Sequence, residues 1–88
     1  MRIQRIKISP LFEKRYKKIP KKIKEKAKEK EKIFRDNPFH PPLGTHKLSG
    51  KDKEYWAFWI NYSYRIKFIF LNNEEVLFLD IGTHDIYK

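Results

Sequence analysis

Two histidines and one arginine are the residues of this chain best suited to acid–base chemistry on a phosphate. His46 and His84 each follow a Gly-Thr pair where a predicted strand meets a loop, in LGTHKL and IGTHDIY. Histidine titrates near neutral pH, so two on one face can act as general base and general acid. Arg65, set among apolar residues in YRIKF, supplies a cation for the charge that develops on a phosphorane. These three side chains are sufficient for RNA cleavage by 2′-OH attack without a metal.

Other polar residues fit supporting roles. Tyr87 can stack a base or orient the phosphate, and it can equally be a tail aromatic packed on the sheet. Taken singly, each histidine is also consistent with an ordinary turn position, and His40 reads as structural or exposed. A metal site built from His46, His84 and Asp85 is conceivable, but the basic surroundings and the spacing argue against it. The sequence therefore predicts neither a metal nor another cofactor.

The stretch Tyr55–Phe70, YWAFWINYSYRIKFIF, must position the arginine. Read with period two, it predicts two strands joined by a tight turn near Asn61–Ser63. Four residues of the second strand, from Tyr64 to Phe70, then form one aromatic face, while Arg65 and Lys67 fall on the other. The aromatic face needs a cover, so Arg65 is expected on the open face, displayed to solvent. The pattern leaves open which of Phe58 and Trp59 shares the face of Arg65.

The N-terminal segment supplies the cover. After a short strand in Arg2–Ile8, Ser9–Pro10 predicts a helix start and Ile19–Pro20 a break before a second helix that ends near Asp36. One apolar stripe on this helical hairpin comprises Phe12, Tyr16, Ile19, Ile23, Ala27 and Phe34. Short strands are expected at Thr45–Ser49 and Val76–Ile81. The predicted fold is α+β, with the order β-α-α-β-β-β-β and both helices on one face of a small antiparallel sheet.

Charge separates the chain into two parts. Residues 1–36 hold 15 Lys and Arg against 5 Asp and Glu, whereas residues 37–88 hold six of each, so the whole net charge of +10 lies on the N-terminal segment. Charge at this density favours a polyanion as partner, although a lysine-rich solvated helix is the plainer interpretation. The 88 residues suit a single domain over 1–88, with no cysteine, signal peptide or bilayer-spanning run. A cytoplasmic protein without membrane contact is expected.

Three motifs in order resemble the RelE/ParE superfamily of bacterial toxins, nearest to the YafQ-type and YoeB-type mRNA interferases. The motifs are THKLSG, then YWAFWINYSYRIKF, then LDIGTHDIY, and the resemblance covers essentially the whole chain. It implies a microbial RNase-like fold, a toxin of a toxin–antitoxin system, and endoribonuclease cleavage of ribosome-bound mRNA that inhibits translation. It also implies a cognate antitoxin that covers the site, and we expect that antitoxin to be acidic because the toxin is basic.

The resemblance also assigns residues. Arg65 corresponds to a phosphate-binding catalytic arginine, His46 and His84 to acid–base positions, and Tyr87 to a C-terminal aromatic that contacts the nucleotide. Trp59 stands where many relatives have arginine, and a tryptophan there can stack on a base. Basic helices would add affinity for mRNA and rRNA phosphates. The residues expected to bind RNA are Lys47, Lys51, Lys53, Trp59 and Lys67.

Two alternatives keep the fold and change the function. The first is a ParE-like toxin that inhibits DNA gyrase without catalysis, although such relatives typically lack the paired histidines. The second is a toxin-derived binding module with weak activity, for which the tryptophan at position 59 is the best argument.

Overall fold

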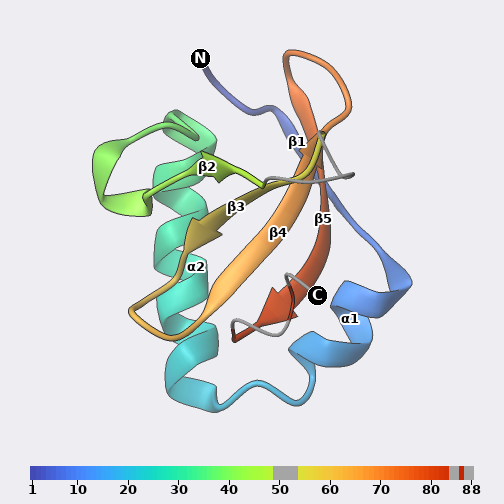
Figure 1. Ribbon diagram of the computed structural model, residues 1–88, viewed down its shortest axis with the longest axis vertical. Helices are drawn as coiled ribbons and strands as arrows, with labels where there is room; N and C mark the ends of the chain where they lie inside the picture. The colour runs from blue at the N-terminus through green and yellow to red at the C-terminus, as the bar shows by residue number, and fades with distance from the viewer. Residues whose placement is uncertain (49–53, 84–85, 87–88) are drawn as a thin grey trace.

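The computed structural model describes residues 1–48, 54–83 and 86, which form one five-stranded sheet with two helices against it (Figure 1). The strand order is β1-β5-β4-β3-β2. β1 runs parallel to β5, and the other three pairings are antiparallel. The strands are β1 (Arg5–Ile8), β2 (His46–Lys47), β3 (Trp56–Trp59), β4 (Arg65–Phe70) and β5 (Glu75–Gly82).

The helices begin and end where the sequence predicts breaks. In α1 (Pro10–Tyr16), the Ser9 hydroxyl accepts a hydrogen bond from the Phe12 amide at 3.0 Å, and Pro10 takes the first helical position. Pro20 precedes α2 (Lys21–Asp36), which ends before Asn37. A short 3-10 turn, η1 (Pro41–Leu43), occupies the proline-rich loop. None of the helices in the described residues is long and apolar enough to cross a membrane.

Phe34 of α2 is the centre of the core. Its ring is fully buried and lies 4.7, 5.0 and 5.6 Å from the ring centroids of Phe58, Phe68 and Phe78. α1 adds Phe12, whose centroid is 5.5 Å from that of Phe78. Both helices therefore cover the same face of the sheet, as predicted. Figure 1 shows α2 running along β3 and β4, with α1 beside the end of β5.

The β3–β4 hairpin has the predicted tight turn. The Ile60 amide donates to the Tyr64 carbonyl at 2.9 Å, and the Asn61 side chain accepts from the amides of Ser63 and Tyr64. In the resulting register Trp59 lies directly opposite Arg65. Trp59 is therefore the residue that shares the face of Arg65, while Phe58 is in the core.

The α+β prediction is confirmed, with one change in the sheet. We predicted antiparallel pairing throughout, but β1 is parallel to β5 because the last strand inserts between β1 and β4. The alternation of apolar and polar residues shows which face of the sheet a side chain takes, but it is the same in parallel and antiparallel strands, so it does not predict the direction of β1.

A bulge beside Lys67 and Phe68 adds one residue to β5, where the buried Asp80 accepts a hydrogen bond from Arg15 of α1 at 2.9 Å. This ion pair ties α1 to the end of β5.

Candidate functional site

Three predicted site residues lie on the sheet face opposite the helices, on three neighbouring strands. His46 of β2 pairs with Ala57 of β3, so both side chains take the same face. Trp59 lies two residues further along β3 on that face and pairs with Arg65 of β4. Histidine, tryptophan and arginine therefore follow one another across the sheet on its open face.

His46 is exposed, and its ring is oriented by the backbone. Nδ1 lies 2.9 Å from the Gly44 carbonyl oxygen. A carbonyl only accepts hydrogen bonds, so this contact places the hydrogen on Nδ1, and Nε2 is the basic nitrogen of the neutral ring. The histidine is thus set up to take or give a proton through Nε2.

Arg65 is on the predicted face, but it is buried rather than displayed. Only 8% of the residue is exposed, and Nη1 donates to the Asn61 and Tyr62 carbonyls at 3.3 and 3.1 Å. The carbon of the guanidinium lies 5.4 Å from the centroid of the Trp59 ring. The expectation of a solvent-displayed arginine is wrong because the hairpin turn and the indole enclose the group. Its charge remains on the open side of the sheet, since the next residue, Ile66, is the one that faces the helices.

Trp59 is held against Gly44. A Cβ built on Gly44 would meet three atoms of the six-membered indole ring at 2.7, 2.7 and 2.9 Å, so the ring packs on the glycine backbone. Gly44 also has φ +57°, a left-handed conformation that other residues adopt at a cost. Glycine is therefore required here for two independent reasons. Gly44 is not among the predicted site residues, and its position directly after Pro-Pro-Leu is the feature of the sequence that could have identified it.

Of the lysines expected to bind RNA, the two that the structure describes lie on opposite faces of the sheet. Lys67 is on the open face, with Nζ 4.3 Å from the centroid of the Tyr55 ring. Lys47 pairs with Trp56, and its Nζ lies 5.9 Å from that ring, so its side chain leaves β2 on the side opposite His46. Lys51, Lys53, His84 and Tyr87 lie outside the described residues. Gly82, two residues before His84 in sequence, pairs with Arg65.

No group of three His, Asp or Glu side chains in residues 1–48, 54–83 and 86 is arranged to hold a metal ion. The chemistry that the described part of the site offers is therefore that of an imidazole, a guanidinium and an indole. A proton can move at the imidazole, and negative charge is stabilised at the guanidinium.

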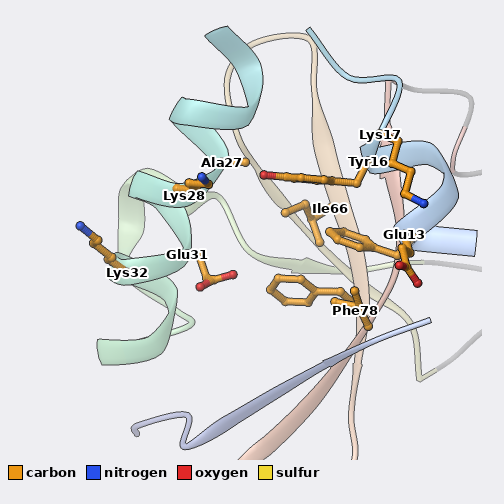
Figure 2. A pocket seen from close by; sticks show the side chains of 11 residues that line it. Glu13, Tyr16, Lys17, Ala27, Lys28, Glu31, Lys32, Ile66 and Phe78 are labelled. Atoms are coloured by element: carbon orange, nitrogen blue, oxygen red, sulfur yellow. The ribbon is translucent and has the colours of Figure 1, made fainter. Parts of the chain in front are cut away.

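A second feature is an open groove of about 620 Å³ between α1 and α2, on the helix side of the sheet. Its floor is apolar and consists of Phe12, Tyr16, Ala27, Ile66 and Phe78, while its rim carries Glu13, Lys17, Lys28, Glu31 and Lys32. Figure 2 shows the Tyr16 side chain reaching from α1 towards Ala27, with the rim charges on either side. The apolar floor is left partly open because the two helices are set apart over the sheet.

Comparison with solved structures identifies the fold. The YoeB/ParE toxin from Agrobacterium tumefaciens superposes with a TM-score of 0.78 at 14% identity, over 92% of this chain and 99% of that one. YafQ from E. coli strain BL21(DE3) superposes with a TM-score of 0.75 at 24% identity, over 94% and 97%. The E. coli DinJ–YafQ toxin–antitoxin complex gives 0.75 at 22% identity, over 98% and 97%. No protein-family model matches the chain, and none of the curated proteins does. The chain has the RelE/ParE-like α+β fold over nearly its full length.

Proposed function

We propose that this protein is the toxin of a toxin–antitoxin system and acts as an endoribonuclease on ribosome-bound mRNA. The observation that carries the proposal is the row of His46, Trp59 and Arg65 across the open face of the sheet. The fold match to YoeB/ParE and YafQ toxins supports the same class of protein.

In the proposed reaction the RNA 2′-OH loses its proton and attacks the adjacent phosphate. The bond from phosphorus to the 5′-oxygen of the next nucleotide breaks, so that a 2′,3′-cyclic phosphate forms and the leaving oxygen takes up a proton. His46 Nε2 exchanges a proton with one of the reacting oxygens, because Nδ1 is committed to the Gly44 carbonyl. His84 takes the complementary acid–base role. Arg65 stabilises the phosphorane, and its burial strengthens this effect because little water screens the charge.

The test is cleavage of a reporter mRNA in a translation extract that contains the purified protein. We expect His46→Ala to lower the cleavage rate by roughly 10²- to 10⁴-fold, the usual contribution of a general acid or base. The matched control is His40→Ala, which removes an exposed histidine beside Asn37, away from the open face. An unchanged rate in the double variant His46→Ala/His84→Ala would exclude this mechanism.

Basic side chains supply the affinity for the ribosome in this proposal. Lys67 contributes a cation on the open face, and Lys51 and Lys53 are proposed to do the same. The lysines of α2 add contacts with rRNA phosphates that do not depend on sequence. Binding that rests on such contacts weakens as salt increases, because counterions are released from the RNA. A salt-independent association with ribosomes would argue against this part of the proposal.

An acidic antitoxin helix is proposed to occupy the α1–α2 groove. The groove offers an apolar floor with three lysines and two glutamates on its rim, a small excess of positive charge that suits an amphipathic helix with acidic flanks. The net charge of +10 favours such a partner. The superposition on a toxin that was crystallised with its antitoxin, the DinJ–YafQ complex, supports a partner of this class.

Charge reversal on α2 tests the groove. Lys28→Glu/Lys32→Glu changes two exposed rim residues, whereas Lys21→Glu/Lys22→Glu makes the same change of net charge outside the groove. With the product of an adjacent acidic reading frame as the binding partner, the rim variant is expected to weaken the complex by roughly tenfold, mainly through slower association. Equal weakening by both variants would mean that only the net charge matters.

A further inference from the structure

Trp59 has no part in the proton transfers proposed above, yet it lies between the histidine and the arginine. We propose that Trp59 is the base-stacking residue of the site and that it favours a purine beside the reacting phosphate. This inference rests on the proposed function, because it names the nucleotide that the same site accepts.

The indole is both exposed and fixed in place. Trp59 retains 43% of its surface, although Gly44 packs on the ring and Arg65 lies beside it. An aromatic side chain that is already held in one orientation loses little conformational freedom when a ligand stacks on it.

The charges around the ring select the kind of ligand. Arg65 pairs directly with Trp59, and Lys67 follows on the same face of β4. A nucleotide fits this arrangement, because its base can stack on the ring while its phosphate is attracted by the positive charge of Lys67 and of the buried Arg65.

Ring size gives the selectivity. The nine-atom indole overlaps a two-ring purine over a larger area than a one-ring pyrimidine, and stacking strength follows that overlap. His46 pairs with Ala57, two residues before Trp59, so the histidine and the indole lie on the same face of two neighbouring strands. We infer that the stacked base belongs to a nucleotide that flanks the scissile bond.

Fluorescence provides a direct test, because the chain has two tryptophans and the other one can be replaced. Trp56 packs with Phe39 and Phe70 at the opposite end of β3, so Trp56→Phe keeps an aromatic ring there and leaves Trp59 as the sole tryptophan. The protein is titrated with single-stranded oligoadenylate or oligouridylate, both fully 2′-O-methylated so that the attacking hydroxyl is blocked. Binding is measured independently by anisotropy of a dye on the oligonucleotide.

Saturating oligoadenylate is expected to quench the Trp59 emission and to bind more tightly than oligouridylate. Trp59→Ala is expected to weaken oligoadenylate binding by roughly tenfold to a hundredfold and to remove the purine preference, with Trp59→Phe in between. The matched control is Tyr62→Ala, which removes a 94% exposed aromatic ring from the tip of the same hairpin and is expected to leave the affinity unchanged.

Three results would overturn the inference: binding without a change in Trp59 emission, equal affinity for both oligonucleotides, or an equal loss in the Tyr62 variant. The first two are measured with Trp59 in place, so they hold even if the alanine variant fails to fold. Failure of the proposed nuclease looks different. In that case oligoadenylate still quenches Trp59, but no variant of the histidines changes the integrity of mRNA.

Discussion

Replacing Gly44 by alanine should destabilise the protein and displace the Trp59 indole. Gly44 has φ +57°, and a left-handed conformation costs a residue with a Cβ about 1–2 kcal/mol. The new methyl group would also stand 2.7 Å from two ring atoms of Trp59, closer than carbon atoms can approach, so the ring or the backbone must move. Together these effects predict a loss of about 1–3 kcal/mol in the free energy of unfolding.

For a domain of this size, each kcal/mol lowers the melting temperature by roughly 4–8 °C. The Gly44→Ala variant is therefore expected to melt about 5–20 °C below the parent protein in a circular dichroism scan. The Trp59 emission should shift in the same variant, because the ring loses its support. Chemical denaturation gives the free energy without dependence on the scan rate.

Gly82→Ala is the matched control. Among the described residues, a Cβ on Gly82 would meet Cγ2 of Ile86, at 2.8 Å, and φ at this position is outside the left-handed region. Cγ2 is the branch methyl of the buried Ile86, so that side chain must shift, but no left-handed backbone is involved, and the expected loss is smaller than for Gly44→Ala. Equal melting temperatures for the two variants, or a Gly44 variant as stable as the parent protein, would refute both the backbone strain and the ring contact.

Three further predictions concern stability. Phe34→Ala should cost about 3–5 kcal/mol, because a fully buried ring in contact with three others is replaced by a cavity; urea denaturation measures it. Ser9→Ala removes the hydroxyl that caps α1 and that also donates to the Leu79 carbonyl, and it should cost about 1–2 kcal/mol; Ser9→Asp recovers only the cap, because a carboxylate cannot donate to that carbonyl. The third concerns pH: hydrogen bonds from Arg5 and Asn72 lower the pKa of Glu75 from 4.5 to about 2. The carboxylate therefore stabilises the fold above pH 4.5, and this contribution disappears as the pH falls towards 2. Melting curves of the parent protein and Glu75→Gln should differ at pH 6 and converge near pH 2.

Much of the fold follows from local patterns in the sequence. Period-two alternation in residues 55–70 predicts the hairpin and the face that carries Phe68, and the spacing of Phe12, Ala27 and Phe34 predicts the helix faces that cover it. These features depend on which side of an element is apolar. The apolar side of each element is the one that joins the core under the helices, so the sequence is enough to identify those core residues.

The environment of Arg65 could not be predicted in the same way. Its face follows from alternation, but its burial depends on the Asn61 and Tyr62 carbonyls and on where the Trp59 ring comes to rest. The ring position depends in turn on Gly44, which comes from a different loop. Contacts between side chains that are distant in sequence leave no periodic signal, so the fine geometry of a site is determined only by the assembled fold.

The two candidate surfaces lie on opposite sides of one sheet, and this constrains how a partner could inhibit the protein. Arg65 and Ile66 are neighbours in β4, yet Arg65 belongs to the open face and Ile66 to the floor of the α1–α2 groove. A helix seated only in the groove would therefore leave His46 and Trp59 uncovered. Under the proposed function, neutralisation requires either a second antitoxin segment that passes around an edge of the sheet, or loss of the basic helix surface that the ribosome needs. The two routes can be tested separately, because a substitution on one face of the sheet leaves the residues of the other face in place.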